Sequence, residues 1–388
     1  MKKSKKILAA LLAAVIIFSV PTLTVSAYSC DKQESAQKLD AGALLDRIRA
    51  IIKDIFGIKD ENGGSVKMSS FEQGKIFKKD LKTDSAHAST VLLLPDGRYL
   101  SAWFGGTGEG NRDVRIWYSF FEDGKWCEPA QIETDDNTAH WNPVLQDFGS
   151  YARLYFKVGD DTESWVTKYS DYTYSAETWS AVKELVEGDR SGGRGPVKNK
   201  CLVTSESRII AGASTEKGDW KAFFDISDDG GKTWSRTDYV KTPKKLFGNV
   251  QMIQPTMWED SSGVHAFFRT KSGRIYRSDS SDGGLTWCEA YETSLPNNSS
   301  GIDCVMTDNG WLWLAYNPIG VNGIRNKLIL SVSKDGGKTW EKVKTLESSA
   351  NLFAEFSYPA IIAEGNRIFI TYTYKREIIK YVTFEFEG

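Results

Sequence analysis

The sequence predicts an all-β fold, a six-bladed β-propeller of four-stranded antiparallel blades. Three observations predict it: a tryptophan recurs at a nearly fixed interval, its flanking segments alternate as strands do, and the repeated part has the length of six such units. The intervals are 53, 55, 53 and 53 residues, between Trp126, Trp179, Trp234, Trp287 and Trp340. A repeat of this size indicates one supersecondary unit used again and again.

Three of the tryptophans end nearly the same eight residues, at 227–234, 280–287 and 333–340. Each box contains Asp-Gly-Gly, a hairpin signal because glycine accepts positive φ without a Cβ clash. The preceding runs, such as residues 327–333, are rich in β-branched residues. We therefore expect a tight turn between two antiparallel strands, with Asp and Ser side chains capping backbone N–H groups and Trp filling the gap between neighbouring units.

The length of the repeated part sets the number of blades. Residues 71–388 are 318 residues, and 318 divided by 53 is six. A period of about 50 residues fits a four-stranded blade. The sixth blade has no box, and we expect strands from both ends of the chain to close it, which protects sheet edges. A β-solenoid is the alternative.

The N-terminal part indicates export. Residues 1–27 combine a lysine-rich start, an apolar run from Ile7 to Val20 and a small-residue pattern ending at Ala27, as a secretory signal peptide does. We expect a secreted or extracellular protein, and an uncleaved N-terminal anchor that attaches it to the cell surface is the alternative. Within residues 28–70, residues 40–58 predict a short amphipathic helix followed by a linker.

Composition narrows the partners. The net charge of −2 gives no indication of a nucleic-acid partner. Five cysteines are too few and too scattered for a disulfide framework, so mostly buried free thiols are expected. No Cys/His cluster has zinc spacing, and no cofactor is predicted.

In a propeller the innermost strands start at one rim of the central channel, where side chains from different blades converge. The repeat places these starts in six segments, each with polar residues ahead of an apolar strand: 85–90, 139–143, 194–200, 250–255, 298–303 and 354–359. His87 and His140 fall in them, whereas His265 lies in a strand pattern and is interpreted as structural. Arg269 and Arg325 each lie one strand before a box in neighbouring blades, and two guanidinium groups facing one channel would suit a carboxylate or sulfate.

The boxes and their surroundings resemble the Asp-box (BNR) repeats of the sialidase superfamily, over residues 71–388. The resemblance implies an arginine triad that holds the substrate carboxylate, a tyrosine nucleophile with a glutamate partner, and an aspartate acid/base. Arg269 and Arg325 match the second and third arginines, and Asp113 falls where the aspartate would.

Other positions depart from that pattern. His87-Ala-Ser stands where the family has Arg-Ile-Pro, and Gln254 stands where the family has its glutamate. The nucleophile position falls on Phe356, with Tyr358 two residues on and expected to face the same side of the strand. A glutamine cannot take a proton from tyrosine, so the usual covalent route depends on whether Tyr358 substitutes.

Three functions remain open for a propeller whose partner is a glycan or acidic oligosaccharide. The first is hydrolysis of a terminal acidic sugar, and the second is elimination at a uronic acid, with His87 or a tyrosine as the base and the two arginines on the enolate. The third is glycan binding without catalysis, with Trp103, Trp141 and Tyr358 stacking on sugar rings. The candidate catalytic residues are His87, Asp113, Gln254 and Tyr358, and the candidate binding residues are Arg194, Arg269, Arg325, Trp141, Asn142, Asp303 and Glu355.

Overall fold

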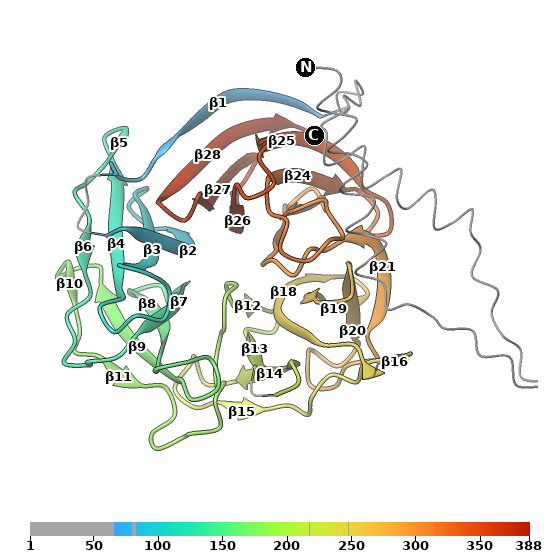
Figure 1. Cartoon of the computed structure of the whole chain (residues 1–388), viewed down its shortest axis with the longest axis horizontal. Coiled ribbons are helices and arrows are strands. Elements are labelled where there is room, and N and C mark those ends of the chain that lie inside the picture. Colours follow the sequence, from blue (N-terminus) through green and yellow to red (C-terminus); the bar gives the residue numbers. More distant parts are fainter. Residues whose placement is uncertain (1–65, 80–82, 217, 247) are drawn as a thin grey trace, which may run out of the picture. The chain divides into compact units, whose positions relative to one another are not determined.

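The computed structural model describes residues 66–79, 83–216, 218–246 and 248–388. The predicted signal peptide (1–27) and N-terminal helix (40–58) lie outside the described residues. Within the described part of the chain, no helix is long and apolar enough to cross a membrane. Six antiparallel sheets of four or five strands surround a common centre, so the predicted propeller is confirmed (Figure 1).

Blades 1 to 3 follow one another in sequence, and the first strand of each lies innermost (Figure 1). Blade 1 comprises β2 (Ser85–Leu93), β3 (Tyr99–Gly106), β4 (Arg115–Glu122), β5 (Lys125–Trp126) and β6 (Ala130–Gln131). Blade 2 comprises β7 (His140–Asp147), β8 (Tyr151–Val158), β9 (Val166–Thr173), β10 (Thr178–Trp179) and β11 (Lys183–Glu184). Blade 3 comprises β12 (Leu202–Val203), β13 (Ile209–Thr215), β14 (Lys221–Ser227) and β15 (Ser235–Arg236).

A short ribbon separates blade 3 from blade 4 and comprises β16 (Lys244–Lys245) and β17 (Gly248–Asn249). Blade 4 comprises β18 (Met252–Asp260), β19 (Gly263–Thr270), β20 (Arg274–Ser280) and β21 (Tyr291–Pro296). Blade 5 comprises β22 (Asp303–Met306), β23 (Leu312–Tyr316), β24 (Lys327–Ser333) and β25 (Glu341–Ser348).

Both ends of the described chain build blade 6, as expected. Its strands run in the order β1 (Lys67–Lys75), β28 (Ile378–Glu387), β27 (Arg367–Tyr374) and β26 (Phe356–Glu364). The N-terminal strand β1 is therefore the outer edge, paired with β28 (Figure 1). The sequence pattern places the start of the propeller at residue 71, but β1 already begins at Lys67. The inner strands β2 and β26 then pack against each other and close the ring.

The boxes form the predicted turns. In the box of blade 5, Ser333 Oγ accepts a bond from the Gly337 N–H at 2.8 Å, and Asp335 carboxylate oxygens accept bonds from the Thr339 N–H and hydroxyl. The other two complete boxes repeat these contacts. This accounts for the recurrence of Ser, Asp and Thr at fixed places in the repeat.

Each box tryptophan packs on the preceding blade, as predicted. The ring of Trp287 in blade 4 stacks on Phe224 of blade 3, with ring centroids 4.0 Å apart. Trp126 of blade 1 contacts Phe369 and Tyr381 of blade 6, which continues the pattern across the closure. Burial of such large rings between sheets stabilises each blade interface.

The described cysteines are all free, but only Cys201 and Cys304 are buried. Cys127 is half-buried and Cys288 is exposed. The expectation of mostly buried thiols is therefore wrong for this pair, because each follows a box tryptophan at the outer part of its blade.

Candidate functional site

Four inner strands share an irregularity near their starts. The pairing register of β2, β7, β18 and β26 with the next strand shifts at this point, as in a β-bulge. One residue of each bulge has a positive φ: Ala88 (54°), Asn142 (42°), Gln254 (55°) and Tyr358 (51°). Left-handed backbone is uncommon for residues with a side chain, and bulges redirect side chains. The inner strands are therefore bent at one level, beside the channel rim.

Three arginines reach this rim from three consecutive blades. Arg269 lies near the end of β19, Arg325 in the connection from β23 to β24, and Arg376 in the turn from β27 to β28. Each lies at the end of the second strand of its blade or in the connection after it, so each lies at the end of the sheet where the inner strand starts. Their three positive charges all act on one imidazole, that of His87. We call Arg269, Arg325, Arg376, Glu355, Tyr358 and His87 the hub site.

Arg269 joins blade 4 to blade 6. Its Nη1 donates to Tyr358 Oη at 2.6 Å and to Gln254 Oε1 at 3.1 Å. Neither partner is a carboxylate, and among the described residues no carboxylate lies within ion-pair distance of this guanidinium. The Nε of Arg269 is buried and has no hydrogen-bond partner within the described structure. The charge and a donor of Arg269 are therefore available to an anionic ligand.

Glu355 connects the other two arginines. Its carboxylate accepts bonds from Arg325 Nη1 and Arg376 Nε, each at 2.8 Å, and from Ser357 Oγ at 2.6 Å. Arg376 also pairs with Glu109, which lies in the connection between β3 and β4 of blade 1. Burial alone would raise the pKa of Glu355, but the surrounding positive groups, His87 when protonated and then both arginines, hold this pKa well below its usual value. Glu355 is thus a permanent anion that orients the two guanidinium groups.

His87 is fully buried beside Tyr358. The two ring centroids are 4.2 Å apart, and Phe104 contacts the imidazole edge-on at 5.5 Å. Neither imidazole nitrogen has a hydrogen-bond partner among the described residues. Burial first, and then the charge of Arg376, lower the pKa of His87 well below 6.5, although Glu355 opposes this. The ring is therefore neutral at pH 7 and able to accept a proton.

Tyr358 and Phe356 do not face the same side, contrary to the expectation from strand alternation. Phe356 packs on Tyr374 in the core of blades 5 and 6, whereas Tyr358 contacts Arg269 and His87. The bulge at Tyr358 inserts a residue into the strand and breaks the two-residue alternation. The tyrosine thus lies in the hub site, and the phenylalanine does not.

Arg194 and Asp303 have structural partners. Arg194 Nε donates to Asp225 on β14, and its Nη2 donates to the carbonyl of Trp234, so this guanidinium points outward along blade 3. Asp303 accepts bonds from Lys200, Thr256 and the backbone N–H of Ile361. It thereby links blades 3, 4, 5 and 6 and has little capacity left for a ligand.

Four further candidate residues lie outside the hub site. The carboxylate of exposed Asp113 accepts bonds from the Thr107 N–H and hydroxyl; burial opposes ionisation, but these bonds lower the pKa of Asp113, so the ionised form is favoured. Trp141 Nε1 donates to the Gly159 carbonyl, and Trp103 stacks on Phe77, so both rings are packed in the core. Asn142 is buried at its bulge.

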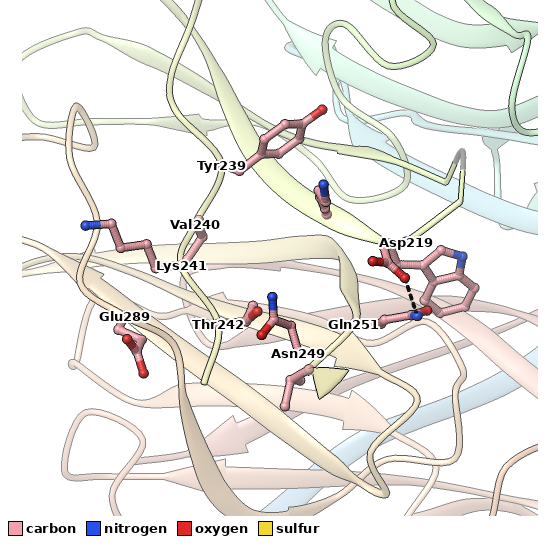
Figure 2. Close-up of a pocket in the computed structure, with 11 residues that line it drawn as sticks. Asp219, Tyr239, Val240, Lys241, Thr242, Asn249, Gln251 and Glu289 are labelled. Carbon is pink, nitrogen blue, oxygen red and sulfur yellow. Dashed lines mark hydrogen bonds between the residues drawn. The ribbon is translucent and has the colours of Figure 1, made fainter. Parts of the chain in front are cut away.

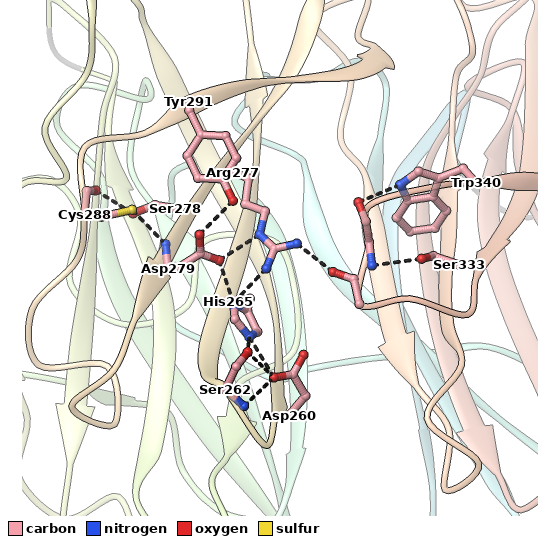
Figure 3. A network of polar contacts seen from close by, with 12 residues as sticks. Asp260, Ser262, His265, Arg277, Ser278, Asp279, Cys288, Tyr291, Ser333 and Trp340 are labelled. Carbon is pink, nitrogen blue, oxygen red and sulfur yellow. Dashed lines mark hydrogen bonds and ion pairs between the residues drawn. The ribbon is translucent and has the colours of Figure 1, made fainter.

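The other histidines lie outside the hub site. His140 stacks on Phe156, and burial lowers its pKa to about 4. His265 lies near the start of β19, at the end of blade 4 where the box turn follows β20. Its Nδ1 contacts Asp279 at 2.5 Å and its Nε2 contacts Asp260 at 3.0 Å (Figure 3). Arg277 extends this network to the box of blade 5 through the Gly336 carbonyl, which supports a structural role for His265.

Sequence reasoning missed Arg376, Glu109 and Glu216. The repeat spacing could have predicted Arg376, because this residue follows Arg325 by 51 residues and Arg325 follows Arg269 by 56. Glu109 and Glu216 follow the second strands of blades 1 and 3 in the same way. Burial raises the pKa of Glu216, although the charges of Arg269 and Lys271 oppose this. Burial thus favours the protonated form of Glu216 relative to a free glutamate.

Lys198 is a further buried group near the hub site. Its ammonium donates to Asn199 Oδ1 at 2.7 Å and to the Pro359 carbonyl, and it lies 6.0 Å from the Tyr358 ring centroid. Burial lowers the pKa of Lys198 to about 7. Within the described part of the chain, no group of three His, Cys, Asp or Glu side chains could hold a metal ion.

Comparison with known proteins supports this architecture. The family model described as BNR repeat-like domain matches residues 97–370. A Dyadobacter fermentans protein of unknown function has the same fold, with 16% identity, a TM-score of 0.66, and coverage of 83% of this chain and 99% of that one. No curated protein matches the chain.

Two sialidases also share the fold. Trypanosoma rangeli sialidase, solved with the inhibitor DANA, has 12% identity and a TM-score of 0.63 over 83% of this chain and 60% of its own. The Hadza microbial sialidase Hz136 has 12% identity and a TM-score of 0.65 over 81% of this chain and 68% of its own. The resemblance to the sialidase superfamily is thereby confirmed at the level of the fold, and this chain spans about 60% of the trypanosomal enzyme.

Proposed function

Because the chain belongs to the BNR repeat-like family, we propose that its hub site binds the carboxylate of an acidic sugar and that the protein hydrolyses the bond joining this sugar to a glycan. Trypanosoma rangeli sialidase, a protein of the same fold, has been solved in complex with sialic acid, an acidic sugar. At 13% identity that likeness concerns the fold, so the proposal depends on the residues of this chain.

One observation carries the proposal: Arg269, Arg325 and Arg376 converge on a single rim from three blades. A guanidinium group binds a carboxylate through two parallel hydrogen bonds, and three of them together select strongly for an anion. Two carboxylates, Glu355 and Glu109, pair with Arg325 and Arg376, and none pairs with Arg269 within the described structure, so the three arginines carry more positive charge than their partners neutralise. A bound carboxylate would balance the remainder.

The proposed reaction uses three further side chains. The phenol oxygen of Tyr358 attacks the anomeric carbon of the bound sugar, and its proton passes to His87. The glycosidic bond breaks as Glu216 gives a proton to the leaving oxygen. Water then attacks the tyrosine–sugar bond: Glu216 takes a proton from the water, and His87 returns its proton to the phenol oxygen of Tyr358, which leaves the sugar. His87 takes the place that Gln254 cannot fill, because an amide accepts no proton at neutral pH.

Elimination at a uronic acid is the second candidate, and the state of His87 favours it. A buried, neutral imidazole with no partner among the described residues would take the C5 proton, and the arginines would hold the enolate charge. The bond to the leaving oxygen would then break as Glu216 gives this oxygen a proton. Hydrolysis consumes one water molecule for each bond broken, whereas elimination consumes none.

Mass spectrometry of a panel of sialosides, uronate-capped oligosaccharides and sulfated glycans separates them. Hydrolysis gives products whose summed mass exceeds the substrate by one water, and elimination gives no such gain. Arg269→Ala should remove either reaction, whereas Arg367→Ala, which removes an exposed arginine paired with Glu385, should not. Binding without any product, seen as a raised thermal midpoint, would refute both reactions.

A further inference from the structure

The side chain of Lys198 reaches across the centre of the ring. Lys198 lies in the connection from β11 to β12, where blade 3 starts, and is 3% exposed. Its ammonium donates to Asn199 Oδ1 at 2.7 Å, to the Ile302 carbonyl directly before β22 at 3.2 Å, and to the Pro359 carbonyl in β26. One buried side chain thus joins blade 3 to blades 5 and 6, neither of which is its neighbour in the ring.

The same ammonium holds the strand segment that carries Tyr358. Pro359 directly follows Tyr358, the residue with φ of 51° at the bulge of β26. The ammonium lies 6.0 Å from the Tyr358 ring centroid. Gly301 permits this approach, because a Cβ there would lie 3.1 Å from Lys198 Cε and 3.4 Å from Tyr358 Cγ.

Asn199 extends this hold to a second bulge. Its Nδ2 donates to the carbonyls of Gln254 and Pro255 in β18, at 3.1 and 3.0 Å. Gln254 and Tyr358 are the two residues to which Arg269 Nη1 donates. The lysine and its neighbouring asparagine therefore fix both partners of Arg269.

The hydrogen bonds around Lys198 require its proton. A lysine ammonium has three donors and no acceptor, and three oxygen atoms accept from this one. A neutral amine has two N–H donors and a lone pair, so one of the three oxygen atoms would lose its donor. An unpaired carbonyl is costly in a buried place, so loss of the proton should loosen the contact with β26.

The surroundings of Lys198 bring this loss of a proton close to neutral pH. Burial lowers the pKa of Lys198 to about 7; the carboxylate of Asp303 opposes this, whereas Lys200 and Arg269 act in the same direction. Cys304, the other titratable group of β22 that faces the ammonium, is neutral, because burial raises its pKa to about 12. Both forms of Lys198 are therefore populated near pH 7.

We infer that Lys198 is a positioning residue of the hub site: its ammonium holds the bulge that presents Tyr358, and loss of its proton releases this hold. Lys198 acts through Tyr358, because it is buried and does not line the pocket of about 410 Å³ beside Trp220 (Figure 2), whose ring lies 4.8 Å from the guanidinium carbon of Arg269. The consequence for turnover rests on the proposed function, whereas the effect on Tyr358 does not.

Nuclear magnetic resonance of protein with ¹³C-labelled tyrosine tests the effect on Tyr358 without a substrate. The signal of Tyr358 is the one that disappears in Tyr358→Phe. In the wild-type protein it should move between pH 6.5 and 8.5 with a midpoint near pH 7. In Lys198→Met, which has no amine to titrate, it should stay still over this range.

Lys157→Met is the matched control. Lys157 is also fully buried, and burial lowers its pKa to about 7, but its ammonium donates to Thr167 Oγ1 and the Arg194 carbonyl between blades 2 and 3. This variant loses an equally buried ammonium and should keep the pH-dependent movement of the Tyr358 signal. A wild-type signal that stays still, or one that moves equally in Lys198→Met, would overturn the inference. Lys198→Arg, charged at all these pH values, replaces Lys198→Met if that variant does not fold.

Turnover separates the inference from the proposed function. If only the protonated form of Lys198 supports turnover, kcat on an acidic glycoside should fall about eightfold from pH 6.5 to pH 8, and this fall should be absent in Lys198→Met. A moving Tyr358 signal in a protein without turnover would support the inference and refute the function. Turnover with a wild-type signal that stays still would do the reverse.

Discussion

Two adjacent residues of one turn offer a sharp test of the hub site. Lys375 and Arg376, between β27 and β28, both have φ of 56°. This left-handed conformation costs a residue with a side chain roughly 1–2 kcal/mol. Only Arg376 contacts carboxylates, those of Glu355 and Glu109. The changes Lys375→Gly and Arg376→Gly relieve the same strain, but only the second removes a charge from the hub site.

The two changes should affect stability in opposite directions. Glycine adds chain entropy to the unfolded state, roughly 0.5–1 kcal/mol, so relief of strain leaves Lys375→Gly more stable by about 0.5–1 kcal/mol. Arg376→Gly makes the same gain but loses the partly buried bond to Glu355, about 1.5–3 kcal/mol. It also loses the more exposed pair with Glu109, about 0–1 kcal/mol. The net loss for Arg376→Gly is about 1–3 kcal/mol.

Activity should separate the two variants further. Loss of one preorganised donor at a charge-binding site lowers kcat by about 10²–10³, so Arg376→Gly should lose that much on an acidic glycoside, whereas Lys375→Gly should stay within about twofold. Thermal midpoints and kcat on the same preparations measure both effects. Wild-type turnover in Arg376→Gly, together with a raised midpoint, would refute the idea that strain in this turn is maintained to position a ligand-binding arginine.

Four more predictions concern the arginines of the hub site, His87 and the box turn of blade 5. Arg269→Ala and Arg325→Ala should each abolish turnover or binding of an acidic glycan with an unchanged circular dichroism spectrum, and full activity in both would exclude a carboxylate site. Burial lowers the folded-state pKa of His87 well below 6.5, so turnover limited by its neutral imidazole should not fall between pH 8 and 6.5. In the unfolded chain His87 gains its proton near pH 6.5, so the free energy of unfolding should decrease as the pH falls below 6.5. This decrease should be smaller in His87→Gln. An equal pH dependence of the free energy of unfolding in the two proteins would contradict the burial of His87. Asp335→Ala, which removes the acceptor for the Thr339 N–H and hydroxyl, should cost about 1–3 kcal/mol in urea unfolding and leave turnover intact.

The periodic part of the sequence predicted the fold well. A tryptophan at intervals of 53 to 55 residues indicates similar surroundings in each blade that has one. In the structure each box tryptophan contacts the preceding blade. The same period located the starts of the inner strands and brought His87, Arg269 and Arg325 to one rim. Repetition makes such predictions possible, because the same assignment of strands and turns is made in every unit and a wrong assignment would have to be repeated in all of them.

The hub site itself was harder to predict, since it departs from the repeat. The bulge at Tyr358 changes which residue of β26 faces the channel, and no residue type in the sequence indicates that a bulge lies there. Arg194 looked like a ligand for the channel, but Asp225, buried in β14, binds it from within the blade. That pairing joins residues 31 positions apart, and only the folded sheet brings them together. The signal peptide and the N-terminal helix stay predictions.

The order of strands in blade 6 has a consequence for how the protein is made. β1 leaves the ribosome first among the described strands, yet its partner β28 is the last of them to be synthesised. Until β28 has been synthesised, β1 has no pairing partner and the ring lacks its sixth sheet. We therefore expect ring closure to be a late folding step, before which the chain depends on chaperones or on rapid synthesis of β28 to avoid pairing with other chains.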